Sequence, residues 1–340
     1  MTANDLHETA RAIVADHRGI LAADESTGTM KKRLDSIGVE STEENRRFYR
    51  GLLFSAPGME EFIGGVILYD ETIRQAADDG TPFPELLASK GVIPGIKVDT
   101  GAHDLAGFPG EKVTEGLDGL RARLEEYRGL GAGFAKWRAV ITIGDGIPTR
   151  ACIRANAHAL ARYAALCQEA GIVPIVEPEV LMDADNTVER CHEVTAQTLH
   201  WTFHELGAQG VDPKGTLLKP NMVISGKGCP VQATASQIAE RTIDCFLRHV
   251  PAAVPGIVFL SGGQSEVQAT ENLNAINRLG GPWPLSFSYG RALQASALEA
   301  WGGDAANAEA AQAAFVHRAR MNSLAVAGEW SAELEQPVAA

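Results

Sequence analysis

The run Gly133-Phe-Ala-Lys-Trp-Arg-Ala-Val140 and the later run Ile172-Val-Pro-Ile-Val-Glu-Pro-Glu179 decide the fold. Each is short and apolar, which is typical of a buried β-strand. Between them, Ile153 to Ala170 places Ala, Leu, Tyr and Cys at helical spacing. Strand, helix and strand in this order predict a βαβ unit with parallel strands.

The same pattern recurs along the chain. The candidate strands are Gly19 to Glu25, Gly64 to Asp70, Ile93 to Asp99, Gly133 to Val140, Ile172 to Glu179, Gly215 to Met222, Gly256 to Gly263 and Pro284 to Arg291. Amphipathic stretches such as Thr187 to Leu206 separate them. Eight such units close most naturally into an α/β fold of the (β/α)8 barrel type. A doubly wound open sheet is the alternative, but Ala23-Asp-Glu-Ser-Thr-Gly-Thr29 is not a dinucleotide fingerprint.

Length and composition are consistent with this fold. The chain has 340 residues and is 45% hydrophobic. We expect one barrel domain over residues 1–340, with an N-terminal helix before the first strand and a short polar C-terminal tail. The net charge of −13 argues against nucleic acid or an anionic membrane as a partner. The five cysteines form no C-x-x-C pair, and no signal peptide or membrane-length run is present, which predicts a cytoplasmic protein.

Three lysines, Lys97, Lys136 and Lys219, lie inside apolar strand candidates. Lysine is rarely buried without a partner, because the ammonium group loses its hydration. Three such lysines in one chain predict an electropositive pocket in which amines take part in chemistry.

Further polar residues stand where the strands end, which is where barrel active sites lie. They are Asp24, Lys97 with Asp99, Lys136 with Arg138, Glu177 with Glu179, and Lys219 with Asn221. Residues two apart in a strand share a face, so we expect all of these side chains to face one cavity. Any single pair is equally well explained as a structural ion pair or a solvated strand end. Five together favour a functional site.

Lys219 is the best candidate for a nucleophile. Lys97 has Asp99 on its own face, and Lys136 has Arg138. Lys219 lies among apolar neighbours with no carboxylate in its own strand, so desolvation and nearby cations should lower its pKa. A neutral amine attacks a ketone to form a Schiff base. The alternative is a lysine that extends to water at the strand end.

Glu177 and Glu179 place two carboxylates on one face. Two adjacent carboxylates do not both ionise freely, so one pKa should rise toward neutrality and suit a general acid or base. The alternative is that these carboxylates only neutralise the lysines, which is as plausible as the catalytic role for Glu179 and less so for Glu177.

Two small-residue turns follow the last two strands, at the position where barrels commonly bind phosphate. Ser261, Gly262 and Gly263 form the first turn. The second contains Ser288, Gly290 and Arg291, and Arg291 adds a guanidinium for an anion. Arg33, on the expected helix after the first strand, would add a second anion site on the opposite side of the mouth. Either turn alone is more often just a turn.

Long motifs resemble those of class I fructose-bisphosphate aldolases. They are Gly19-Ile-Leu-Ala-Ala-Asp-Glu-Ser-Thr-Gly28, Thr42-Glu-Glu-Asn-Arg-Arg-Phe-Tyr49, Phe134-Ala-Lys-Trp-Arg138, Ile172-Val-Pro-Ile-Val-Glu-Pro-Glu179, Leu217-Leu-Lys-Pro-Asn-Met222, Phe259-Leu-Ser-Gly-Gly-Gln-Ser265 and Phe287-Ser-Tyr-Gly-Arg-Ala-Leu-Gln-Ala-Ser296. The resemblance implies a (β/α)8 barrel and reversible cleavage of fructose 1,6-bisphosphate to dihydroxyacetone phosphate and glyceraldehyde 3-phosphate. It also implies a Schiff-base mechanism without a metal or other cofactor, and often a homotetramer.

Carried over by motif, the resemblance assigns roles within the predicted pocket. Lys219 resembles the Schiff-base lysine, Glu177 the acid/base at the carbinolamine stage, and Asp24 the base that takes the C4 hydroxyl proton. Lys136 and Glu179 would tune charge, Arg138 would bind substrate, and Lys97 and Arg33 would face the 6-phosphate. The residues for the 1-phosphate would be Ser261, Gly262, Gly263, Ser288, Gly290 and Arg291.

One feature of the family is missing from the motifs, and three alternative functions stay open. Many members end in a tyrosine that assists proton exchange at the enamine carbon, but the last tyrosine here is Tyr289. A metal-dependent aldolase or hydrolase would use His192, His200 and His204, which lack the H-E-x-x-H order. A non-catalytic barrel would give no reason to keep Lys219 and Glu177 together. An aldolase for another phosphorylated sugar differs only at the phosphate sites.

Overall fold

The computed structural model describes residues 3–336, and within them eight parallel strands close into a barrel in the order β1-β10-β9-β8-β7-β6-β3-β2. The barrel strands are β1 (Gly19–Ala22), β2 (Ile63–Leu68), β3 (Ile93–Lys97), β6 (Phe134–Ile141), β7 (Val173–Val180), β8 (Leu217–Leu218), β9 (Ile257–Phe259) and β10 (Leu285–Tyr289). Every candidate strand of the sequence analysis contributes one of these, so the predicted (β/α)8 barrel is confirmed.

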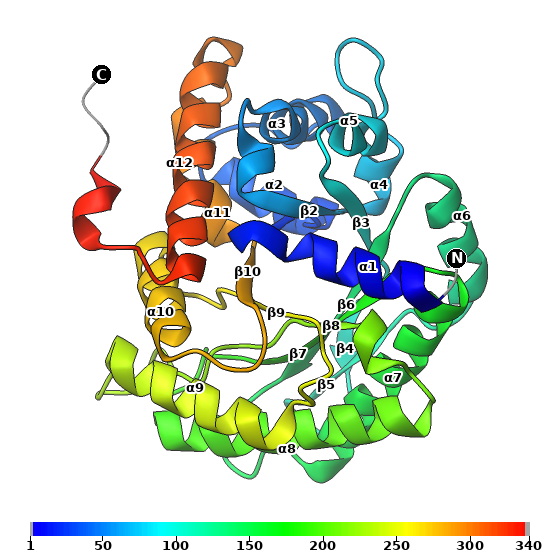
Figure 1. Ribbon diagram of the computed structural model, residues 1–340, viewed down its shortest axis with the longest axis vertical. Coiled ribbons are helices and arrows are strands. Elements are labelled where there is room, and N and C mark those ends of the chain that lie inside the picture. Colours follow the sequence, from blue (N-terminus) through cyan, green and yellow to red (C-terminus); the bar gives the residue numbers. More distant parts are fainter. Residues whose placement is uncertain (1–2, 337–340) are drawn as a thin grey trace.

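Helices surround the barrel as an outer layer (Figure 1). The α-helices after β1 are α2 (Thr27–Asp35), α3 (Glu43–Ser55), α4 (Asp70–Ile73), α5 (Phe83–Ser89), α6 (Leu120–Gly129), α7 (Arg150–Glu169), α8 (Val188–Ala208), α9 (Ala235–His249), α10 (Glu266–Leu279), α11 (Arg291–Trp301) and α12 (Ala308–Ala327). Short 3₁₀ helices are η1 (Ala15–His17), η2 (Met59–Glu61), η3 (Pro213–Gly215), η4 (Ala305–Asn307) and η5 (Ala332–Glu335). Threonine and serine side chains cap several helices, as Thr149 does for α7 and Ser265 for α10.

The N-terminal helix α1 (Ala3–Ile13) closes the amino-terminal end of the barrel. Its apolar residues, including Ile13, are buried against the inward-facing Phe134 and Leu217. Helix and barrel approach so closely that a Cβ on Gly64 would lie 2.2 Å from the Ile13 carbonyl oxygen, so only glycine fits there. Because this end is closed, the open mouth lies at the carboxyl ends of the strands.

Side-chain alternation in β6 separates the core from the site. Trp137 is fully buried between the strands and α7, where its ring stacks on Tyr163 with centroids 5.5 Å apart. Its neighbours Lys136 and Arg138 therefore point to the other side of the strand, into the barrel mouth. The packing of one tryptophan thus fixes the direction of two cationic side chains.

The sequence analysis missed the antiparallel hairpin of β4 (Gly101–Asp104) and β5 (Lys112–Glu115). Its strands are short and largely polar, so they lack the apolar run used to find the others. The hairpin follows β3, and Thr114 donates to the carbonyl of Arg138 at 2.7 Å.

Among residues 3–336 no helix combines the length and apolar character needed to cross a membrane. One domain for the whole chain stays a prediction, and residues 337–340 of the expected tail lie outside the described residues.

Candidate active site

A cavity of about 560 Å³ opens at the carboxyl ends of the barrel strands. All three of the lysines singled out in the sequence line it. The other predicted residues on its wall are Asp24, Arg33, Asp99, Arg138, Glu177, Glu179, Ser261, Gly262, Ser288, Gly290 and Arg291. Residues from distant parts of the chain therefore converge on one mouth, as strand alternation predicted.

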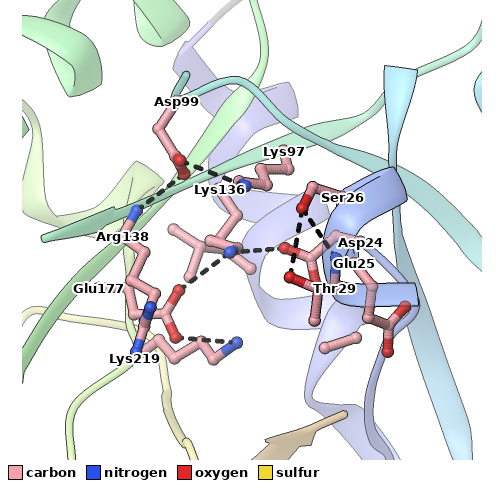
Figure 2. Close-up of polar contacts among 12 residues, drawn as sticks. Asp24, Glu25, Ser26, Thr29, Lys97, Asp99, Lys136, Arg138, Glu177 and Lys219 are labelled. Atoms are coloured by element: carbon pink, nitrogen blue, oxygen red, sulfur yellow. Dashed lines mark hydrogen bonds and ion pairs between the residues drawn. The ribbon is translucent and has the colours of Figure 1, made fainter. Parts of the chain in front are cut away.

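Lys136 is the centre of the charge network (Figure 2). Its Nζ lies 2.6 Å from Asp24 Oδ2 and 3.3 Å from Glu177 Oε2. The lysine is 4% exposed, and burial of this kind requires such partners. Asp24 follows β1, Lys136 is in β6 and Glu177 is in β7, so this cation links opposite parts of the barrel.

Lys219 and Glu177 form the second buried pair. Lys219 Nζ lies 3.1 Å from Glu177 Oε1. The position of Lys219, directly after β8, is fixed by its backbone N–H, which donates to the carbonyl of Val176 at 2.8 Å. Lys219 therefore has a carboxylate partner, supplied by the neighbouring strand and not by its own.

The lysines hold both acidic groups in their charged forms. Burial alone would raise the pKa of Asp24, but Lys136 and Lys219 outweigh burial and hold this pKa well below its usual range. Burial likewise acts to raise the pKa of Glu177, yet the same two lysines lower it. For Lys136, burial opposes the charge, but Asp24 and Glu177 raise the pKa. The sequence predicted a raised pKa for one member of the Glu177–Glu179 pair. The pKa of Glu177 is lowered instead, because the cations around it outnumber its carboxylate neighbours.

A second set of ion pairs lies nearer the rim. Lys97 Nζ is 3.4 Å from Asp99 Oδ1, and Asp99 Oδ2 accepts the backbone N–H of Arg138 at 3.2 Å. The guanidinium of Arg138 pairs with Glu179. The pairings of Lys97 and Arg138 are therefore rim contacts, whereas Lys136 and Lys219 share the buried Glu177.

The end of β10 and the turn that follows it have the features expected of an anion site. Ser288 is buried, and its hydroxyl oxygen has no hydrogen-bond partner among the described residues. A buried hydroxyl without a hydrogen-bond partner costs free energy, which indicates that a ligand supplies the partner of Ser288. After Tyr289, the last residue of β10, Gly290 caps α11 and Arg291 begins this helix. Ser261 and Gly262 line the same cavity from the turn after β9.

Two expectations about the anion sites are wrong. Arg33 does not lie across the mouth from the turn after β10: a Cβ on Gly290 would lie 3.4 Å from its Nη2. The reason is topological, because α2 follows β1 and β1 pairs with β10. Gly263 is the second exception, because its N–H donates to the Met182 sulfur at 2.8 Å instead of facing the cavity.

Asn221 also departs from the predicted pattern. Its side chain is buried, accepts the Val180 N–H at 3.0 Å and donates to the Thr195 hydroxyl at 3.0 Å. The strand β8 ends at Leu218, so strict alternation does not extend from Lys219 to Asn221. Asn221 therefore ties β7 to α8 and is not part of the cavity wall.

Sequence reasoning missed one group of residues on the cavity wall. It comprises Glu25, Ser26, Thr29, Lys32 and Ser36. Apart from Glu25, these residues recur every three or four positions from the N-cap Ser26 to the C-cap Ser36 of α2. Helical periodicity applied to this segment was therefore the available signal. Glu25 is buried, and its Oε1 lies 2.7 Å from Arg33 Nη1.

The histidines considered for a metal site lie on α8, in the outer layer. His192 Nε2 is 3.1 Å from Asp244 Oδ2, and the rings of His200 and His204 stack with centroids 6.5 Å apart. Over residues 3–336, no group of three or more His, Cys, Asp or Glu side chains is arranged to hold a metal ion.

Comparisons with known proteins relate the whole chain to one family. The family model "Fructose-bisphosphate aldolase class-I" matches residues 5–340. A probable fructose-bisphosphate aldolase class 1 of Xanthomonas campestris is 58% identical over 332 residues, covering 97% of this chain and 99% of that protein. Fructose-bisphosphate aldolase C-B of Danio rerio is 53% identical, with 96% and 91% covered. A solved structure of fructose-bisphosphate aldolase from Plasmodium falciparum, in complex with TRAP and a small-molecule inhibitor, superposes with a TM-score of 0.96 at 48% identity, with 97% of this chain and 96% of that chain covered.

Proposed function

The chain belongs to the class I fructose-bisphosphate aldolase family, and we propose that Lys219 is the amine that joins the substrate. The enzyme is a lyase of glycolysis and gluconeogenesis, which reversibly cleaves fructose 1,6-bisphosphate to dihydroxyacetone phosphate and glyceraldehyde 3-phosphate through a lysine Schiff base. The observation that supports Lys219 is its position: buried in the mouth, with Nζ 3.1 Å from Glu177.

The lowered pKa of Glu177 is compatible with an acid/base role. The Glu177 carboxylate, whose Oε1 lies 3.1 Å from Lys219 Nζ, accepts a proton from the Lys219 nitrogen, and the resulting neutral amine attacks the C2 ketone to give a carbinolamine. The carbinolamine nitrogen is neutral, so Glu177 then loses Lys219, one of the three cations that depress its pKa together with Lys136 and Arg138. Protonated Glu177 donates to the departing C2 hydroxyl, which leaves as water, and the iminium forms.

Cleavage then requires a second base. We assign this role to Asp24, which Lys136 keeps ionised at 2.6 Å. Asp24 takes the C4 hydroxyl proton, the C3–C4 bond breaks, and its electron pair moves into the iminium to give an enamine. Glyceraldehyde 3-phosphate leaves, Asp24 gives its proton up to solvent, and the enamine gains one proton from solvent at C3. Water then adds to the resulting iminium and releases dihydroxyacetone phosphate and the Lys219 amine. Glu179 tunes the charge through its pairing with Arg138, which also contacts substrate.

The turns after β9 and β10 are proposed to bind the 1-phosphate. Ser261, Gly262, Ser288, Gly290 and Arg291 supply hydroxyl, amide and guanidinium donors on the cavity wall. Arg33 adds its charge beside Gly290 and not at the far rim.

For the 6-phosphate we retain Lys97, whose pairing with Asp99 at 3.4 Å leaves its remaining ammonium hydrogens for a ligand. The cavity-lining hydroxyls of Ser26 and Thr29, at the start of α2, are further donors to this phosphate.

A substrate comparison tests these assignments. Cleavage of fructose 1,6-bisphosphate and of fructose 1-phosphate is measured with coupled dehydrogenases for wild type, Lys97→Met and Lys219→Met. Lys219→Met should reduce both reactions to background. Lys97→Met should raise KM only for the bisphosphate, by about tenfold for one lost charged contact. Equal effects of Lys97→Met on both sugars would show that Lys97 does not contact the 6-phosphate.

A homo-oligomer, specifically a tetramer, and a cytoplasmic location stay proposals, supported by the resemblance to the aldolase family and by the sequence. Light scattering coupled to size exclusion measures the first, with four chains per particle expected. Fractionation of cells that express the protein measures the second.

A further inference from the structure

The loops that follow β7 and β8 are joined by backbone hydrogen bonds. The N–H of Lys227 donates to the carbonyl of Met182 at 2.8 Å, and the N–H of Gly228 donates to the carbonyl of Ala184 at 2.9 Å. A Cβ on Gly226 would lie 2.2 Å from the Ala184 carbonyl oxygen, so the loops approach too closely for a side chain there. We refer to residues 182–186 and 226–228 together as the double loop.

The double loop presents a sulfur atom to the turn after β9. The N–H of Gly263 donates to Met182 Sδ at 2.8 Å. Gly262 has φ +61°, and a Cβ added there would lie 2.9 Å from the same sulfur. Met182 therefore contacts both glycines of the turn on the side away from the cavity.

The double loop also places a charge on this turn. A Cβ on Gly263 would lie 2.1 Å from Lys227 Nζ, so the ammonium group covers this glycine. Lys227 pairs with Asp183 at 2.6 Å, but the side chains are 46% and 63% exposed. An exposed pair of this kind is weak, so the charge of Lys227 is only partly neutralised near the turn.

We propose that Met182 and Lys227 are positioning residues for phosphate binding. Met182 holds the Gly263 amide away from the cavity, which fixes the peptide planes of the turn so that Ser261 and Gly262 face the phosphate. Lys227 packs over the turn and adds positive potential behind it. This inference rests on the proposed role of Ser261 and Gly262 in binding the 1-phosphate.

Four variants and one control test the proposal. Met182→Ala removes the contact, and Met182→Leu keeps its volume without the sulfur acceptor. Lys227→Met removes the charge, and Asp183→Asn removes the carboxylate that pairs with Lys227. Lys214→Met is the matched control, because Lys214 is an exposed lysine on η3, near α1 at the opposite end of the barrel. For each, competitive inhibition by inorganic phosphate is measured together with KM and kcat for fructose 1,6-bisphosphate.

Met182→Ala should raise the inhibition constant of phosphate and KM by about tenfold, the size expected for one misplaced donor, while kcat changes by less than about twofold. Met182→Leu should restore only part of the loss, because it keeps the volume but not the sulfur that accepts the Gly263 N–H. Lys227→Met should weaken the binding of phosphate and raise its inhibition constant. Asp183→Asn should strengthen the binding of phosphate and lower this constant. Lys214→Met should match wild type.

A second readout separates positioning from general damage. Unphosphorylated dihydroxyacetone forms the same Schiff base, and its trapping by borohydride should be unchanged in Met182→Ala. Equal losses with dihydroxyacetone and its phosphate, or an unchanged phosphate inhibition constant in Met182→Ala, would overturn the inference. Failure of the proposed function has another signature, namely no phosphate inhibition and no trapped adduct in wild type.

Discussion

Glu177 Oε1 lies 3.1 Å from Lys219 Nζ, and the two side chains are only 4% and 5% exposed. The other carboxylate oxygen of Glu177 is 3.3 Å from Lys136. One carboxylate therefore connects the proposed nucleophile to the cation that keeps Asp24 ionised. Proton transfer at the amine and charge at the cleavage base are coupled through this single residue.

Replacing Glu177 with Gln should slow formation of the Schiff base. The amide keeps the volume but neither accepts the ammonium proton nor returns it to the leaving hydroxyl, so the rate of imine formation should fall by about 10²–10⁴-fold. Stopped-flow mixing with dihydroxyacetone phosphate followed by borohydride quenching measures this rate. Glu179→Gln is the control, and a loss equal to that of Glu177→Gln would contradict the assignment.

Asp24→Asn should separate the two halves of the reaction. The Schiff base should still form, because Glu177 remains, while kcat for cleavage should fall by about 10²–10⁴-fold without the base for the C4 hydroxyl. Borohydride trapping and the coupled cleavage assay are run on the same preparation. Cleavage at the wild-type rate would remove Asp24 from the mechanism.

The Asp24–Lys136 pair should make stability depend on pH at both extremes. The pKa of Asp24 is depressed below its ordinary 3.8, so its contribution is present above that pH and is lost as pH falls further. The pKa of Lys136 is raised above 10.5, so its contribution is present below that pH and is lost as pH rises through the raised value. Differential scanning fluorimetry should show the Tm gap between wild type and Asp24→Asn narrowing below pH 3.8. A gap that stays constant there would contradict the pairing.

Two serines of β10 give a matched test of phosphate binding. Ser288→Ala removes a buried hydroxyl without a partner, so Tm should stay the same or rise while KM increases by about tenfold. Ser286 is also buried, but it donates to the Arg18 carbonyl at 2.7 Å. Ser286→Ala should therefore lower Tm and leave KM unchanged. The reverse pattern would show that Ser288 is structural.

The barrel and the convergence of the lysines were predictable from local pattern. Apolar runs gave the strands, and alternation placed Lys136 and Arg138 opposite the buried Trp137. The sequence did not reveal which carboxylate meets which lysine, because Glu177 reaches Lys219 across a strand boundary and its oxygens are shared by two cations. Its lowered pKa follows from that sharing.

The remaining differences have topological causes. Arg33 lies beside Gly290 because the barrel closes β1 onto β10, a pairing between the two ends of the chain that no local signal reports. Gly263 turns toward Met182 because the double loop packs behind it. The β4–β5 hairpin lacks an apolar run, so its pairing depends on backbone bonds that composition does not encode.

Trapping followed by peptide mapping tests the central assignment most directly. Wild type, Lys219→Ala, Lys136→Ala and Lys97→Ala are incubated with dihydroxyacetone phosphate and reduced with borohydride, and the modified peptide is identified by mass spectrometry. We predict one adduct, on Lys219, which is absent from Lys219→Ala and retained in Lys97→Ala. An adduct on Lys136 or Lys97 in the wild type, or one that persists in Lys219→Ala, would contradict the account.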